Sequence, residues 1–310
     1  MTDDNRILIG DCIEQLATLE AGSVQTCVTS PPYYGLRDYG HDGQIGLEDS
    51  PAKYIAKMVE VFAAVRRALR DDGTLWINIG DSYAGGACTG RNDSGRVREG
   101  GGTGSGRVDG SDRKPLPNRI DDRPSKNLLG IPWRLAFALQ DSGWILRSEI
   151  IWHKPNGMPE SVTDRPTKAH EHVFMLVKQA AYYFDPLPLR TRAIGLTGGI
   201  SNKSTSKRIG TGLESPIDGF THPEGANGRT VWSIPTEPYA EAHFACWPTA
   251  LVRRMILAGC PPGGVVMDPF FGSGTTGAVA EQEGRRWIGI ELNPDYLPLI
   301  HKRTAQQGLY

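Results

Sequence analysis

The sequence predicts an α/β fold built on a doubly wound, largely parallel sheet. Short apolar runs alternate with stretches that carry apolar residues at helical spacing, and two of the runs end in turns rich in Pro or Gly. The chain has 310 residues, 39% of them hydrophobic and 22% charged, which is ordinary for one domain-sized core with insertions.

The N-terminal half supplies the first strands of this sheet. Five short apolar runs predict strands, at residues 6–9, 24–29, 74–79, 145–152 and 172–177. Helical spacing of apolar side chains predicts helices at residues 54–69 and 128–139. Residues 173–184, with Lys178 and Gln179 at their middle, predict a terminal hairpin that gives the sheet an antiparallel edge.

The C-terminal third returns to regular structure. It predicts a helix at 248–258, a strand at 265–268, a helix from Thr275, a strand at 287–291 and a last helix from Pro294. One βαβ unit is too small for a doubly wound sheet, so its partner strands must come from the N-terminal half. We expect one domain closed by the two ends of the chain.

Two segments lack the pattern of a core. Residues 85–125 are rich in Gly, Arg, Asp and Ser and predict a mobile surface loop. Residues 186–229 are rich in Gly, Ser, Thr and basic residues and precede the apolar Val231-Trp232-Ser233-Ile234. We interpret this second segment as a small appended module.

Charge, cysteines and hydropathy narrow the class of protein. The net charge is −1, so a surface for nucleic acid must come from local clusters of Arg and Lys. The five cysteines are scattered without a CxxC pair, which disfavours a disulfide framework or a zinc ribbon and favours the reducing cytoplasm. Neither a signal peptide nor a run long enough to span a membrane is apparent, so we expect a soluble, cytoplasmic protein.

Residues 272–277 read GxGxxG directly after a predicted strand, and Glu291 ends the next strand. Glycines let the backbone approach a ligand, and an acid at the second strand end binds ribose hydroxyls, so a nucleotide-containing cofactor is indicated. The same glycine pattern is also compatible with a tight turn that merely needs small residues, or with an NAD site. Asp268 and the Phe270-Phe271 pair would crowd a pyrophosphate, and Asp268 suits a cationic ligand such as S-adenosylmethionine better.

A second turn, residues 29–34, follows the strand at 24–29. Pro31 and Pro32 hold the backbone rigid and remove two N–H donors, so the turn presents acceptors. The Ser30 side chain and the Pro31 carbonyl would draw an exocyclic amino group toward tetrahedral geometry, with its lone pair aimed at a methyl donor. Tyr33 offers a face for an extruded base. Taken alone, this turn is equally read as a rigid bend with an incidental aromatic residue.

Together the two turns resemble the β class of DNA amino-methyltransferases, a circularly permuted group in which [D/N/S]PPY precedes FxGxG. The resemblance implies a Rossmann-like methyltransferase sheet, S-adenosylmethionine as cofactor and double-stranded DNA as substrate. Its catalytic residues would be Ser30, Pro31, Pro32 and Tyr33. Its cofactor-binding residues would be Asp11, Cys12, Phe244, Asp268, Phe270, Gly272, Ser273, Gly274, Thr275 and Glu291.

The resemblance also implies a division of the chain. Residues 1–185 would form the catalytic half, 186–235 the target-recognition region and 236–310 the cofactor-binding half. The basic residues expected to contact DNA are Arg190, Arg192, Lys203, Lys207, Arg208 and Arg229, although each would also suit a solvated loop. The loop at 85–125 is expected to close over DNA. A homodimer and a separate restriction endonuclease are compatible with the family.

The target base stays open between two readings. Ser30 in place of Asp favours cytosine N4, whereas residues 30–40 resemble solitary and prophage-type members among which adenine N6 methylation is known. We favour adenine N6 over cytosine N4. A non-catalytic DNA-binding regulator is a more remote alternative, and an NAD-dependent oxidoreductase would rest on GxGxxG alone.

Two further patterns have weaker interpretations. Strand alternation in His170-Glu171-His172 would bring only the two histidines together, so we predict no metal site. The run Trp152-His153-Lys154-Pro155 ends a strand on the catalytic side, where it suits contact with the target base. Asn78 and Asp81 lie in a segment that resembles a family strand and loop, and the sequence assigns them no role.

Overall fold

The computed structural model describes residues 5–38, 40–41, 43–85, 123–191, 226–237 and 247–305. Their strands are β1 (Arg6–Ile9), β2 (Val24–Thr29), β3 (Leu69–Ile79), β4 (Ile145–His153), β5 (His170–Val177), β6 (Val231–Ser233), β7 (Val265–Asp268) and β8 (Arg286–Glu291). The helices are α1 (Cys12–Thr18), α2 (Pro51–Ala68), α3 (Ile131–Asp141), α4 (Thr249–Gly259), α5 (Thr275–Gln282) and α6 (Leu297–Ala305), with short 3-10 turns η1 (Leu187–Leu189) and η2 (Pro294–Tyr296).

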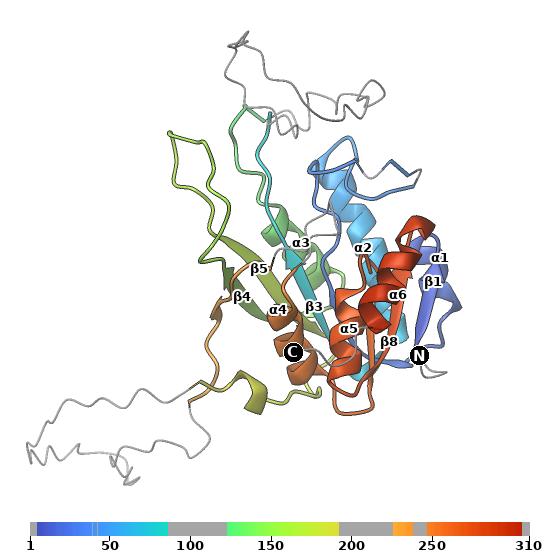
Figure 1. Ribbon diagram of the computed structural model, residues 1–310. Coiled ribbons are helices and arrows are strands. Elements are labelled where there is room, and N and C mark those ends of the chain that lie inside the picture. The colour runs from blue at the N-terminus through green and yellow to red at the C-terminus, as the bar shows by residue number, and fades with distance from the viewer. Residues whose placement is uncertain are drawn as a thin grey trace, which may run out of the picture.

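The strands form one sheet in the order β1-β8-β7-β2-β3-β5-β4-β6 (Figure 1). Strands from the two ends of the chain lie side by side in its middle, because β2 pairs with β7 on one side and with β3 on the other. All the ladders are parallel except those of β5. The predicted α/β sheet, with strands of the C-terminal third inserted beside those of the N-terminal half, is confirmed.

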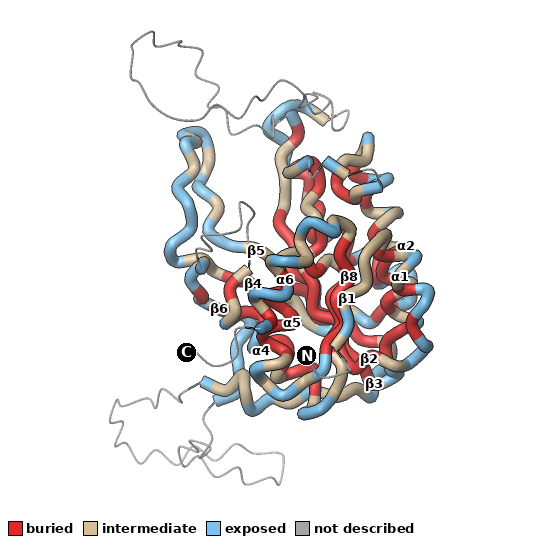
Figure 2. The backbone as a smooth tube through the Cα atoms, turned by 45° about the vertical axis from the view of Figure 1, so that its right-hand side comes forward, coloured by how far each residue is buried: buried red, intermediate tan, exposed pale blue. Residues whose placement is uncertain are grey.

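Helices cover both faces of the sheet. One core lies under α1, α2 and α3, and the other lies under α4, α5 and α6, which stand in front of the sheet in Figure 1. Figure 2 shows the same division, with buried residues concentrated in the strands and on the inner sides of the helices. The largest helix, α2, begins with Pro51 after the cap Ser50 and buries Tyr54, Met58 and Val61 on one stripe.

The predicted hairpin at 173–184 is wrong. β5 ends at Val177, and residues 178–184 form no second strand; the Tyr183 amide makes a single hydrogen bond of 2.8 Å to the Asp72 carbonyl of β3. β5 lies inside the sheet, where Leu176 stands opposite Leu75 of β3 and Leu146 of β4. The antiparallel character therefore comes from β4 and β5, and both edges of β5 are hydrogen-bonded.

The edge strand on this side is β6, which pairs parallel to β4. Trp232 of β6 is buried, and its ring stacks on Trp76 with a centroid distance of 6.4 Å. Residues 231–233, which the sequence groups with the recognition region, thus join the main sheet. Most of the predicted loop at 85–125 and of the segment at 186–229 lies outside the described residues. In the described ranges, no helix has the length and hydropathy needed to cross a membrane.

Candidate active site

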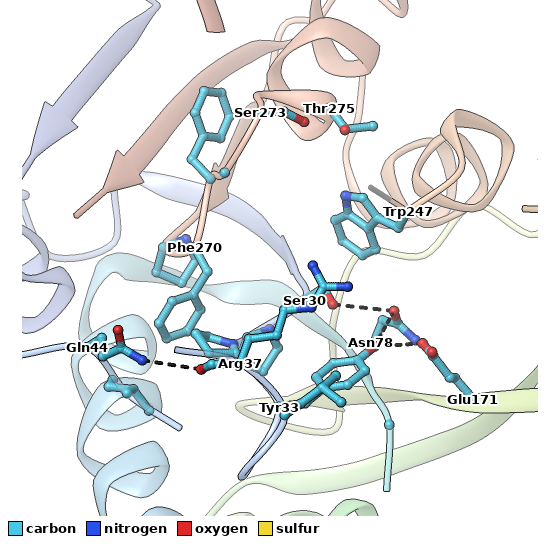
Figure 3. Close-up of a pocket in the computed structure, with 18 of the residues that line it drawn as sticks. Ser30, Tyr33, Arg37, Gln44, Asn78, Glu171, Trp247, Phe270, Ser273 and Thr275 are labelled. Atoms are coloured by element: carbon cyan, nitrogen blue, oxygen red, sulfur yellow. Dashed lines mark hydrogen bonds between the residues drawn. The ribbon is translucent and has the colours of Figure 1, made fainter. Parts of the chain in front are cut away.

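The carboxyl ends of five strands meet at one edge of the sheet and surround a cavity of about 810 Å³ (Figure 3). The residues that follow or end β1, β2, β3, β7 and β8 all contribute to its wall, among them Asp11, Ser30, Gly80, Phe270 and Glu291. This is the edge at which doubly wound sheets bind ligands. The volume lies within the range of about 300–1,000 Å³ that is typical of small-molecule sites.

The glycine turn after β7 forms one wall of the cavity. Gly272 and Gly274 have φ of 53° and 83°, a left-handed backbone that favours glycine, and α5 begins directly afterwards. The Gly272 amide donates to Oε2 of Glu291 at 2.7 Å, and the Asn293 amide donates to Oε1 at 2.9 Å. Burial raises the pKa of Glu291. The carboxylate is therefore fixed in place at the cavity wall.

Asp268 lies behind this wall. Its Oδ1 accepts from the Thr29 hydroxyl at 2.6 Å and from the Phe270 amide at 3.0 Å, and its Oδ2 accepts from the Thr276 hydroxyl at 2.6 Å. The residue is 2% exposed and does not line the cavity, and burial raises its pKa to about 6. The geometry thus favours a role in tying β7 to β2 and α5 over the direct contact with a cationic ligand expected from sequence.

Asp11 and Cys12 form the part of the wall that follows β1. Oδ1 of Asp11 accepts from the amides of Ile13 and Glu14, at 2.8 and 3.1 Å, and so caps α1. The sequence did not predict this seven-residue helix. Burial raises the pKa of Cys12 to about 12, so its thiol stays neutral and serves as an apolar surface rather than a nucleophile.

The turn after β2 forms the opposite wall. Ser30, Pro31, Pro32 and Tyr33 all line the cavity, and the hydroxyl of Tyr54 fixes the turn by donating to the Pro32 carbonyl at 2.8 Å. The Ser30 hydroxyl donates to Oδ1 of Asn78 at 3.4 Å (Figure 3). A hydroxyl that donates in this way keeps its oxygen lone pairs as acceptors.

Tyr33 is held by groups that the sequence did not identify. Its hydroxyl donates to Oε2 of Glu171 at 2.6 Å, with Oδ1 of Asn78 at 3.2 Å from the same oxygen. Burial, with the carboxylate of Glu171 close by, raises the pKa of Tyr33 well above its ordinary value. A Cβ added to Gly80 would lie 2.6 Å from Cε2 of Tyr33, so the ring packs directly on this glycine.

Glu171 also forms an ion pair with Lys154, whose ammonium lies 4.3 Å from the centre of the Trp152 ring. Strand alternation gives Glu171 and its two neighbouring histidines different roles. The rings of His170 and His172 lie together, 5.4 Å between centroids, whereas Glu171 reaches Tyr33. No group of three or more potential metal ligands occurs in the part of the chain that the structure describes.

Arg37, after the Tyr33 turn, extends its side chain into the cavity (Figure 3). Its carbonyl accepts from Nε2 of Gln44 at 3.3 Å, and within the described ranges no carboxylate pairs with its guanidinium. Trp247 adds an aromatic wall from the segment that precedes α4. The sequence predicted neither residue, because both come from irregular segments that only the fold brings to the cavity.

The predicted site residues divide into four groups. Both turns, Asp11 and Glu291 surround one cavity, whereas Asp268 and Gly274 support it from behind. Arg190 and Arg229 lie away from the cavity, the first half-buried after η1 and the second exposed before β6. The remaining residues lie outside the described ranges: Arg192, Lys203, Lys207, Arg208 and Phe244.

Known proteins resemble this chain over most of its length. A family model described as DNA methylase matches residues 24–302. The type II methyltransferase M.SmaI of Serratia marcescens is 46% identical over 302 residues, which cover 97% of this chain and 91% of that protein. M.Cfr9I of Citrobacter freundii, also a type II methyltransferase, is 45% identical over 301 residues, covering 95% of this chain and 85% of that protein.

Solved structures support the fold. The PvuII DNA methyltransferase, described as cytosine-N4-specific, gives a TM-score of 0.65 at 18% identity and covers 100% of this chain and 89% of that one. The complex of M1.HpyAVI with S-adenosylmethionine gives 0.52 at 18% identity, covering 96% and 98%. Because the family model covers most of the chain, including both turns, and two type II methyltransferases are 45% or more identical over nearly its full length, the chain belongs to the N6-adenine/N4-cytosine family of S-adenosylmethionine-dependent DNA amino-methyltransferases.

Proposed function

We propose that this type II DNA methyltransferase methylates the N4 amino group of a cytosine that is rotated out of duplex DNA. The observation that carries the proposal is the meeting of two turns at one cavity. The Ser30-to-Tyr33 turn supplies acceptors and an aromatic face, and the turn around Gly272 supplies a carboxylate and close backbone approach for a nucleotide-like cofactor.

The residues on the glycine side fit S-adenosylmethionine. Glu291 would receive the ribose hydroxyls, Asp11 the adenine, and Phe270 and Trp247 would line the cofactor with apolar surface. Two carboxylates in the wall suit a ligand with a positive sulfonium. When bound, this cofactor supplies an electrophilic methyl group. Asp268 acts as a positioning residue here, because its hydrogen bonds hold the Phe270 amide and the start of α5.

The residues on the other side fit an exocyclic amine. The lone pair of such an amine is delocalised into the ring, so it needs acceptors on its N–H bonds. The Ser30 oxygen and the Pro31 carbonyl can supply them, since both residues line the cavity and the Ser30 hydroxyl can accept through its lone pairs while it donates to Asn78. A strong base is not required, because the nitrogen becomes acidic only after it receives the methyl group.

The choice of base rests on Arg37. Beside its amino group, cytosine carries two neighbouring acceptors, N3 and O2, which match the forked donors of a guanidinium; adenine presents only N1 there, followed by C2–H. The Arg37 guanidinium, without a carboxylate partner among the described residues, extends into the cavity that Ser30 lines. Ser30 in place of Asp points the same way. This proposal reverses the preference for adenine N6 that we drew from the sequence, and the resemblance of residues 30–40 to solitary members keeps adenine N6 as the second candidate.

The test is to identify the methylated nucleoside. Duplex DNA is incubated with the protein and S-adenosylmethionine, digested to nucleosides and analysed by mass spectrometry, with the Tyr33→Ala variant as control. We expect N4-methylcytosine from the wild type and a large loss from the variant. N6-methyladenine would replace the choice of base, and the absence of both products would contradict amino methylation.

Partners follow from the same proposal. We place target recognition in residues 186–235 and expect a separate restriction endonuclease that cuts the sequence this enzyme protects, as the type II relatives imply. A homodimer, the contact of residues 85–125 with DNA and a cytoplasmic location are further expectations. Sedimentation equilibrium of the purified protein, with and without duplex DNA, tests the first of these.

A further inference from the structure

The connection between β4 and β5, residues 154–169, stands out from the sheet (Figures 1 and 2). Several of its residues line the cavity. It carries Met158, which is 87% exposed although it lines the cavity. Met158 is thus a large apolar residue displayed at the mouth of the site, and none of the described residues buries it.

The connection is anchored where it leaves β4. The Thr236 amide donates to Oδ1 of Asn156 at 2.8 Å, and Nδ2 of Asn156 donates to the Thr236 carbonyl at 3.1 Å. The amide of Gly157 closes a turn onto the Lys154 carbonyl at 3.2 Å. The two residues directly before Met158 are therefore held in place, Asn156 by the Thr236 backbone and Gly157 by the Lys154 carbonyl.

The returning arm is anchored as well. Arg165 binds Glu160 at 2.6 Å and lies over the Tyr83 ring, with its guanidinium carbon 4.3 Å from the ring centre. The ammonium of Lys168 donates to the Asp81 carbonyl at 3.1 Å. These contacts hold the arm against the loop after β3. Both ends of the connection that carries Met158 are therefore restrained by the surrounding structure.

A base that rotates into the cavity leaves a gap in the DNA stack, and the loss of its stacking and pairing opposes the rotation. Proteins that open DNA steps insert apolar side chains, Met among them, into such gaps. Met is unbranched and adapts its shape to irregular spaces. An anchored, exposed Met at the mouth of the cavity has the chemistry and the place for this task.

We propose that Met158 enters the base stack of duplex DNA at the position vacated by the target base. This inference rests on the proposed function, because it presupposes that a base is rotated into the cavity. It assigns Met158 a role in opening the DNA, separate from the acceptors and cofactor contacts that carry out the transfer.

The test compares Met158→Ala with Met158→Leu and with Thr163→Ala, an exposed position on the same connection. Single-turnover methylation is measured on a duplex whose methylated site has been mapped, and on the same duplex with an abasic site opposite the target base. On the paired duplex we expect Met158→Ala to slow methylation roughly tenfold, in line with the loss of about one stacked contact. Met158→Leu and Thr163→Ala should stay near wild type.

The abasic duplex separates insertion from a general structural effect. It removes the pairing that opposes rotation, so the defect of Met158→Ala should shrink to less than about threefold relative to wild type on that duplex. Affinity for S-adenosylhomocysteine should not change. Equal defects on both duplexes, or full activity of Met158→Ala, would overturn the inference. So would normal methylation combined with altered sedimentation, which would assign Met158 to a protein contact. If the mapping that precedes these assays finds no amino-methylated base, the proposed function is rejected instead.

Discussion

Tyr33 shows how single residues determine the chemistry of this site. Its hydroxyl is bound by Glu171, and its ring rests on Gly80, so both the orientation and the depth of the ring are fixed before DNA arrives. Ser30, in the same turn as Tyr33, lies next to Asn78. Preorganisation of this kind raises the rate because the groups need not reorient during methyl transfer.

Gly80→Ala tests this packing. Gly80 does not have a left-handed backbone, so the added methyl acts only through its clash with Tyr33, 2.6 Å from Cε2. We expect at least a tenfold lower rate of methyl transfer, roughly the effect of misplacing a reactive group, with unchanged affinity for S-adenosylhomocysteine. Methyl-transfer assays measure the rate, and calorimetric titration measures the affinity for S-adenosylhomocysteine. A fully active variant would show that Gly80 does not hold the Tyr33 ring.

Asp268 makes stability depend on pH. Its pKa in the folded protein is about 6, above the ordinary value of 3.8, so the folded state binds the proton more tightly. Its contribution to stability is therefore present below about pH 4 and is lost as the pH rises through 6, by about 3 kcal/mol in total. Asp268→Asn does not titrate and can still accept from Thr29.

The measurement is urea unfolding of wild type and Asp268→Asn at several pH values. As the pH rises from 4 to 7, the free energy of unfolding of the wild type should decrease relative to that of the variant. If this difference is constant across that range, the carboxylate is not held with a raised pKa.

At the scale of elements, α3 depends on a residue far from it in sequence. Its first amides, those of Gly130 and Ile131, donate to the Asp81 carboxylate at 3.1 and 2.9 Å, and no side chain of its own caps it. Asp81 follows β3, so this contact joins the helix to the carboxyl edge of the sheet. It fixes the loop that contacts Lys168 beside the cavity.

Asp81→Ala should lower the free energy of unfolding by about 1–2 kcal/mol, the usual effect of removing a helix cap. Asp81→Asn keeps an oxygen acceptor and should recover part of that loss. Denaturant unfolding of both variants measures the effect, and an alanine variant as stable as the wild type would contradict the capping role.

Elements whose signal is local were predictable from sequence. The strands at 6–9, 24–29 and 265–268 are confirmed, as are the two turns, since an apolar run followed by Pro-Pro or by glycines defines them without tertiary information. The hairpin at 173–184 failed because pairing with both β3 and β4 decides where β5 ends. For the same reason Glu171 was missed: its place depends on the register of β5.

On the scale of the whole molecule, the sheet joins segments far apart in the chain, and the proposed recognition region contains a bridge, outside the named strands, that brings two of its residues together. The backbones of Thr191 and Ala226 exchange two hydrogen bonds, at 3.0 and 2.8 Å. The intervening residues, 192–225, can therefore be removed without separating their flanks. This geometry allows a direct test of where target recognition resides.

We expect a variant in which Asn-Gly replaces residues 192–225 to fold, because a two-residue turn connects strands that are already paired in this way. It should bind S-adenosylhomocysteine like the wild type and lose methylation of duplex DNA. Retained methylation of the same sites would place recognition elsewhere in the chain, and loss of cofactor binding would show that the segment supports the core.

The central claim is that one cavity joins a cofactor wall and a base wall with separate tasks. Calorimetric titration of S-adenosylhomocysteine into wild type, Glu291→Gln and Tyr33→Ala tests it most directly. Glu291→Gln should bind at least about tenfold more weakly, since it loses a charged hydrogen-bond acceptor, whereas Tyr33→Ala should bind like the wild type. Normal binding by Glu291→Gln, or weakened binding by Tyr33→Ala, would contradict this division of the site.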